Sequence, residues 1–231
     1  MTSPVLTLDF ADASEAADLA AFLGRLIHYD RAAAVRIQAG GGALAVFGRP
    51  ASFDVLAVRS ARLATPHVLD VTVSAGELLE GIGESAGTAG IPAAVTGPPW
   101  AGMLPPRGGW QQLPGLPEED AIRGAVAAAV GEFRSRDERL APGDRTRAQR
   151  DRIGREIWSR TLGGTPLPLR AAHAAQSLGF LRPVRALVPA GGAPEQTVAL
   201  LASGNWLRLR TQYGSIAVRR AGVGGLSVTP A

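Results

Sequence analysis

The amino-acid sequence of 231 residues predicts an α+β protein in three parts. Residues 1–83 show apolar alternation and helical spacing, which indicate a small sheet domain with the element order β-α-β-β-β-β-α. Residues 84–117 show neither pattern and hold 7 Pro and 7 Gly, as is typical of a connector. Residues 118–231 return to helical spacing and then to alternation, which predicts helices followed by a C-terminal β-hairpin.

Capping residues and alternation define the elements of the N-terminal domain. Residues 5–10 alternate as a half-buried strand does. Asp12 and Glu15 form a capping pair ahead of the first helix, and Ser74 and Glu77 repeat this pair ahead of a second. Between the helices, a run of three glycines predicts a hairpin turn. Four strands are expected there, at residues 34–39, 43–48, 53–63 and 68–73.

The connector contains two tryptophans in similar surroundings. Trp100 follows Pro98-Pro99, and Trp110 ends the run Pro105-Pro106-Arg107-Gly108-Gly109. Free indole rings beside Pro and Gly are unfavourable in water, so both rings are expected to dock. One interpretation docks them on the chain's own domains, and the other makes the loop a polyproline-type ligand for a partner. The candidate contact residues of this docking loop are Trp100, Arg107 and Trp110.

Three helices are predicted in the C-terminal part. Acidic residues at 118–120 complement the dipole of a helix that begins there. Thr146 and Gln149 form a third capping pair for the next helix. Pro168 suits the first turn of the last helix, and Gly179 suits the position just after its end.

The hairpin is the sharpest local feature of the sequence. Residues 206–212 and 215–220 both alternate, and a turn centred on Tyr213-Gly214 would place Arg208 opposite Arg219. Like charges directly opposite each other destabilise a sheet, so this face is expected to meet acidic groups. Those groups would belong to the N-terminal domain, to a second copy or to a partner. The predicted contact surface consists of Trp206, Arg208, Arg210 and Arg219.

The charges are distributed unevenly along the chain. All 24 basic residues are Arg; residues 1–119 carry 7 Arg and 12 acids, whereas residues 120–231 carry 17 Arg and 8 acids. The net charges are therefore −5 and +9. Either the two regions have different functions, or an acidic and a basic face of one fold pack together.

Composition argues against several kinds of site. Without Cys there are no disulfides or thiolate sites, and without Lys there is no P-loop. His28, His67 and His173 have no His or carboxylate at ligand spacing, so neither a metal nor a cofactor is expected. No apolar run approaches the roughly 18 residues of a membrane span, and no leader is recognisable. We therefore expect a cytoplasmic protein without membrane contact.

One enzymatic motif is present, in an unsuitable context. Gly83-Glu84-Ser85-Ala86-Gly87 matches the G-x-S-x-G motif of α/β-hydrolases, with Ser85 as nucleophile and His173 as the base downstream. That motif needs a strand before it and a helix after it, but a helix is predicted before it and Pro92 follows closely. The sequence therefore favours a non-enzymatic protein, with a small-molecule hydrolase using Ser85 as an alternative.

A nucleic-acid partner is a further alternative. The order helix, helix, hairpin at 146–158, 169–178 and 206–220 is that of a winged-helix DNA-binding module, and the positive charge suits phosphate. The last helix, however, offers few polar side chains to base edges, among them Arg170 and His173.

Several segments resemble a set of uncharacterised actinobacterial proteins. These segments are residues 105–110, the stretch from Trp158 through Gly164 to Pro168, residues 171–181, and the hairpin from Trp206. The resemblance implies no activity and agrees with a bacterial, non-enzymatic protein. The expected function is that of a non-catalytic binding or regulatory protein acting through the Arg/Trp hairpin surface. A protein partner or a second copy is favoured over nucleic acid.

Overall fold

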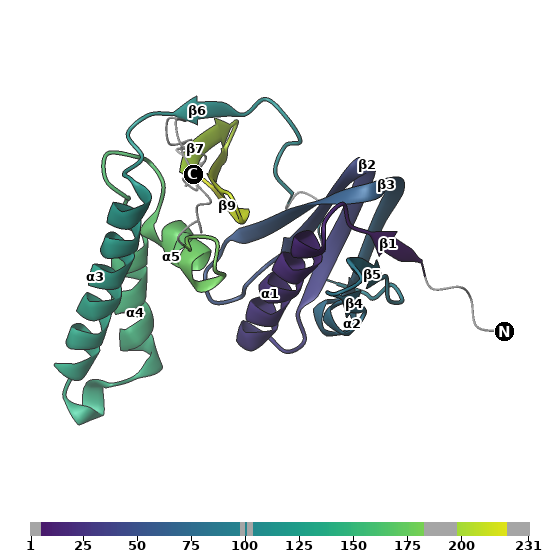
Figure 1. Cartoon of the computed structure of the whole chain (residues 1–231). Coiled ribbons are helices and arrows are strands. Elements are labelled where there is room, and N and C mark those ends of the chain that lie inside the picture. The colour runs from purple at the N-terminus through teal and green to yellow at the C-terminus, as the bar shows by residue number, and fades with distance from the viewer. Residues whose placement is uncertain (1–5, 98–99, 101–103, 183–197, 221–231) are drawn as a thin grey trace, which may run out of the picture.

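The computed structural model describes residues 6–97, 100, 104–182 and 198–220, and its α+β architecture confirms the predicted class (Figure 1). Its large sheet contains β2 (Ala34–Gly48), β3 (Leu56–Ser74), β6 (Gln111–Leu113), β7 (Val198–Ser203), β8 (Trp206–Thr211) and β9 (Gly214–Arg219). A small sheet contains β1 (Thr7–Asp9), β4 (Ile82–Gly83) and β5 (Thr88–Gly90). The helices are α1 (Ala13–Tyr29), α2 (Ala75–Glu80), α3 (Glu119–Glu138), the 3-10 turn η1 (Pro142–Asp144), α4 (Arg147–Trp158) and α5 (Leu169–Ser177).

The large sheet joins segments that are far apart in the sequence. Its strand order is β2-β3-β9-β8-β7-β6, and the pairs of neighbouring strands are antiparallel. At its centre β3 pairs with β9, with Leu56 opposite Ala217 and Val58 opposite Ser215. The connector supplies the edge strand β6, which pairs with β7. Strands from all three predicted parts of the chain therefore belong to one sheet.

The predicted hairpin turn at Gly40–Gly42 is wrong. The chain runs straight through these glycines as β2, and β3 likewise replaces two of the predicted strands. Gly41 has a φ of 61°, and the register shifts between Gly41 and Ala43. A glycine run suits a β-bulge as well as a turn, and the pairing with β3 selects the bulge.

The predicted helix starts are confirmed by their caps. The Asp12 carboxylate accepts a hydrogen bond from the amide of Ser14, at 2.7 Å. Ser74 and Thr146 each accept one from the amide three residues later. After α5, the amide of Gly179 donates to the carbonyl of Gln176, which ends the helix at the predicted position.

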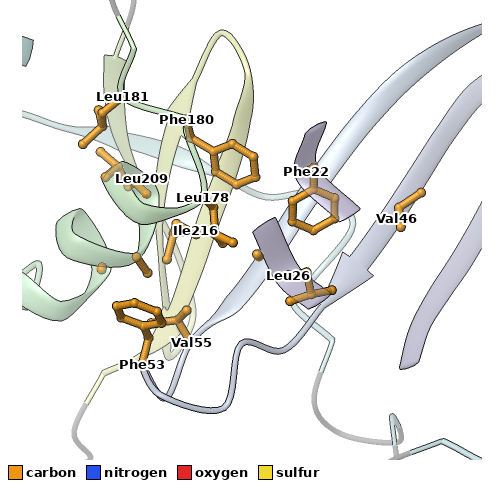
Figure 2. Close-up of a cluster of buried hydrophobic side chains, with 14 of the residues drawn as sticks. Phe22, Leu26, Val46, Phe53, Val55, Leu178, Phe180, Leu181, Leu209 and Ile216 are labelled. Atoms are coloured by element: carbon orange, nitrogen blue, oxygen red, sulfur yellow. The ribbon is translucent and has the colours of Figure 1, made fainter. Parts of the chain in front are cut away.

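One face of the large sheet, which we call the helix face, packs against α1 and α5. Figure 2 shows Phe22 and Leu26 of α1 on one side of this core and Leu209 and Ile216 of the hairpin on the other. The Phe22 ring stacks on Phe180, with ring centroids 5.6 Å apart. A Cβ at Gly214 would lie 2.6 Å from the Phe180 ring, so only glycine permits this approach. The helix face thus ties α1 to the C-terminal hairpin.

The opposite face, which we call the connector face, holds a smaller cluster around Trp100. This side chain is buried, and only 6% of its surface is exposed. Trp206 packs against the same cluster from β8. The cluster's other buried members are Phe47, Leu56, Val58 and Ala217. The connector face is therefore covered by the connector rather than by a helix.

Candidate functional site

The hairpin cluster, which we define as Trp206, Arg208, Arg210 and Arg219, lies on the connector face. The alternation of β8 and β9 places all four side chains there, as the sequence predicts. The predicted register is wrong: Arg208 is opposite Ala217, and Arg219 is opposite Trp206. A two-residue turn, Gln212-Tyr213, shifts the pairing by an even number, which keeps the face but separates the two arginines.

Arg208 is the most enclosed cation of the hairpin cluster. Its Nε donates a hydrogen bond of 2.8 Å to the Ser215 hydroxyl. Its guanidinium carbon lies 5.7 Å from the centroid of the Trp110 ring. Burial lowers the pKa of Arg208, and the charge of Arg210 lowers it further. The side chain stays protonated but is partly removed from water, which strengthens its attraction to an anion.

The other two arginines of the cluster are exposed. Arg210 is exposed at the middle of the sheet face, opposite Ser215. The guanidinium of Arg219 lies over the Trp206 ring, 5.2 Å from its centroid. Such a cation–π contact helps to hold the arginine in place.

The predicted docking loop folds onto this same face. Trp100 is buried there, and Trp110 is half-buried, with its Nε1 donating to the Pro106 carbonyl at 3.0 Å. The Ser203 hydroxyl of β7 donates to the Gly108 carbonyl at 3.2 Å. The rings thus dock on the chain's own sheet, the first of the two interpretations.

Arg107, the third candidate of the loop, is exposed. Two hydrogen bonds from Arg36 lower the pKa of Asp70, and the charge of Arg107 is the smallest contribution to the same shift. Arg107 therefore adds a further positive charge to the connector face.

Two acids of the N-terminal half, Glu15 and Asp18, pair with arginines on the helix face. Arg59 of β3 donates to Glu15 at 3.0 Å and to Asp18 at 3.2 Å, both on α1. It also donates to the Tyr213 carbonyl at 2.9 Å. Arg182 pairs with Asp18 and lies over the Tyr213 ring. Within this network the ion pair of Asp18 with Arg182 joins the acidic half to the basic half, and the hairpin cluster is not part of it.

The structure also brings together an aromatic group that the sequence analysis did not connect. Trp158 at the end of α4 stacks on His173 of α5, with centroids 4.2 Å apart. Phe53, from the loop before β3, meets His173 edge-on, and Tyr29 meets Phe53 in the same way. The two glycines between the helices were the available signal, because they allow α4 and α5 to turn back on each other. Nothing local indicates Phe53 or Tyr29.

The context of Ser85 is not that of a hydrolase nucleophile. The serine lies in the turn between β4 and β5, so a strand follows it where the motif needs a helix. The amide of Ala86 donates to the Gly83 carbonyl, as in an ordinary tight turn.

The arrangement of a winged helix is also absent from the described residues. Both outer edges of the hairpin are paired, β9 with β3 and β8 with β7, so the hairpin does not project. The helix that would read bases, α5, buries Leu169, Ala171, Ala172, Ala174 and Ala175.

Two other kinds of site are absent from the part of the chain that the structure describes. Its His, Asp and Glu side chains form no group of three or more that would hold a metal ion. Among its helices, none has the length and apolar character needed to cross a membrane.

Two family models match the chain, and they meet within the connector. The first, a domain of unknown function (DUF8010), matches residues 3–102. The second, a domain of unknown function (DUF8185), matches residues 105–223. No curated protein and no solved structure gives a match.

Proposed function

The chain belongs to the DUF8185 family, and we propose that it is a cytoplasmic, non-catalytic binding protein whose hairpin cluster holds an acidic protein partner. One observation carries the proposal. Arg208 and Arg210 stand on the same face of β8, and in the described parts of the chain no carboxylate lies within 4.0 Å of either.

The surroundings of these arginines support a specific contact. Arg208 is half-buried between Ser215 and Trp110, so little water is left to remove when a carboxylate binds. Trp110 and Trp206 add aromatic surface on both sides of the cations. Arginine and tryptophan are the residues that most often dominate the binding energy of protein interfaces.

The position of the hairpin supports a protein partner over DNA. A wing or a recognition helix enters a groove by projecting from the fold, whereas β8 and β9 lie between β7 and β3. A flat sheet face with several cations and indole rings suits an acidic protein surface, including that of a second copy.

The test compares two double variants of equal charge change. Arg208→Gln with Arg210→Glu removes two of the three cations of the hairpin cluster, and Arg31→Gln with Arg152→Glu removes two exposed arginines elsewhere. Each tagged protein is used to capture partners from a lysate of the native cells, with and without nuclease. Sedimentation equilibrium of each protein measures self-association.

We expect a nuclease-resistant set of proteins, or self-association, that the wild type and the control retain and the cluster variant loses. If the cluster variant keeps the same partners and the same mass as the wild type, the proposal is wrong. Loss of the captured material on nuclease treatment would replace it with the nucleic-acid alternative.

A further inference from the structure

A pocket of about 900 Å³ opens on the far side of α5 from the sheet. It lies between α3, α4, α5, the end of α1 and the loop at residues 52–54. This volume is within the range of small-molecule sites. The residues that matter for its chemistry are Tyr29, Phe53, Phe133, Trp158, Arg170 and His173. We propose that this pocket binds a small planar aromatic carboxylate.

The aromatic side chains form a wall with fixed ring orientations. The Trp158 and His173 rings are nearly parallel, with 19° between their planes. The Phe53 ring stands at 81° to His173 and 5.0 Å from it. Rings that support one another in this way present a rigid surface, so a flat ligand stacks without ordering the wall first. This wall accounts for the planar, aromatic part of the ligand.

A glycine in the middle of α4 keeps the space beside this wall open. Gly154 lines the pocket, and a Cβ there would lie 3.6 Å from Cδ1 of Trp158 and 3.7 Å from Cε2 of Phe133. These are ordinary contact distances, so the backbone would accept a side chain. Glycine weakens a helix interior relative to alanine. Gly154 leaves a free volume between the Trp158 and Phe133 rings, and a ligand ring would occupy this volume.

Two lining arginines, the exposed Arg155 and the half-buried Arg170, have no carboxylate within 4.0 Å among the described residues. Nε of Arg170 is buried and has no hydrogen-bond partner among the described residues, and no carboxylate there lies within 4.0 Å of its guanidinium. Arg150, also in the lining, pairs with Asp137 at 2.8 Å. The lining acids are Asp151, which is 3.8 Å from Arg147, and Asp54 in the loop before β3. Arg170 is the more buried of the two unpaired arginines, so water satisfies it less, and its planar guanidinium matches a carboxylate.

The occupant is fixed by these three observations together. A ring on the wall places its substituent within the same pocket as Arg170, whose guanidinium has no carboxylate partner among the described residues. An uncharged aromatic molecule would leave that guanidinium unpaired, and an aliphatic acid would not use the stacked rings. The inference is independent of the hairpin cluster, which lies on the connector face.

The test uses 2-naphthoate and its uncharged analogue 2-naphthamide on the full chain. Titration calorimetry measures affinity, and the four indole N–H signals of the ¹⁵N-labelled protein report the site. A Trp158→Phe variant assigns the Trp158 signal. Three further variants are compared: Arg170→Met removes the cation, Gly154→Leu fills the free volume, and Arg152→Met is a matched arginine control on α4 outside the lining.

We expect naphthoate to shift the Trp158 signal and to bind roughly tenfold more tightly than naphthamide, the size of effect that one charge-assisted pair gives. Arg170→Met should remove this preference, Gly154→Leu should abolish binding, and Arg152→Met should change neither. The comparison of the two probes on the wild type does not depend on how any variant folds. Equal affinity for both probes, or a Trp158 signal that millimolar naphthoate leaves unmoved, would overturn the proposal.

Discussion

Each face of the large sheet holds an enclosed arginine, and the two arginines differ in their hydrogen-bond partners. Arg59 on the helix face is only 5% exposed and donates to two carboxylates and a carbonyl. Arg208 on the connector face donates to one hydroxyl, that of Ser215. Burial lowers the pKa of both arginines, and nearby acids oppose that shift only at Arg59.

This difference separates a structural charge from an available one. At Arg59 the chain's own acids offset most of the cost of burying the cation, so the network holds α1 against the hairpin. At Arg208 the cost is offset by an indole ring and a hydroxyl, which leaves guanidinium donors for another molecule. The same residue type therefore has two functions in one sheet.

The largest effect on stability is expected at Trp100, the side chain at the centre of the connector-face cluster. Trp100→Ala should lower the free energy of unfolding by about 3–5 kcal/mol, because it opens a cavity between Phe47, Leu56 and Val58. Urea denaturation measures this change. Trp110→Ala is the matched control, since Trp110 is only half-buried, and should cost far less. Equal losses for the two would show that the connector is held as a unit rather than by Trp100.

Removing the structural charge should have the next largest effect. Arg59→Met should cost about 2 kcal/mol, because Glu15 and Asp18 lose a partner at a nearly buried site. The loss is moderate because Arg62 still pairs with Glu15 and Arg182 with Asp18. The readout is again the urea midpoint. A change under about 0.5 kcal/mol would mean that water replaces the guanidinium without penalty.

The helices that cover the helix face should also respond to pH. Burial lowers the pKa of His173 below 6.5, so the unfolded chain binds a proton more readily than the folded one. Stability should therefore be complete above pH 6.5 and fall as the pH is lowered from 6.5 towards the folded pKa. Phe53 and Trp158 contact this ring, and Arg170 lines the same pocket.

The check is the urea midpoint of wild type and His173→Phe between pH 5 and 7. The variant keeps a ring in the stack and should show a flatter profile. The carboxylates with lowered pKa values, such as Glu132 and Glu156, lose their ion pairs only below 4.5 and do not interfere. Identical profiles would mean that folding does not lower the pKa of His173, which would contradict the prediction.

The smallest effect on stability is expected at Arg208. Arg208→Met should change stability by less than about 0.5 kcal/mol, because no carboxylate in the described chain depends on it and its Nε donates to one hydroxyl, that of Ser215. The same substitution at Arg59 is the comparison. If both cost about 2 kcal/mol, the connector face depends on its arginine for stability as strongly as the helix face does.

The sequence predicted the features that depend on neighbours along the chain. The caps at Asp12, Ser74 and Thr146 were predicted correctly, because a cap is made within three residues. The face of the hairpin arginines was predicted correctly too, because alternation alone decides it. The residues opposite these arginines were predicted wrongly. When the register shifts by an even number of residues, each side chain stays on the same face of the sheet but has a different residue opposite it.

Features that depend on distant residues were missed. The three glycines after Ala39 are compatible with a turn as well as with a bulged strand, and the pairing of β2 with β3 selects the strand. Trp158 and His173 looked like ordinary members of two helices, and Phe53 lies far from both in the sequence. Only the packed structure shows that these rings meet. The predicted boundaries at residues 83 and 117 stay a prediction, although strands from the three segments share the large sheet.

The pairing of β3 with β9 determines when the large sheet can be completed during synthesis. Leu56 leaves the ribosome well before its partner Ala217, which is made 161 residues later. Until β9 has been made, one edge of β3 is unpaired, so the large sheet cannot be completed before β9 is available. Contacts over such long sequence separations slow folding and leave an edge open to wrong partners. We therefore expect chains that stop before β9 to depend on chaperones more than the full chain does.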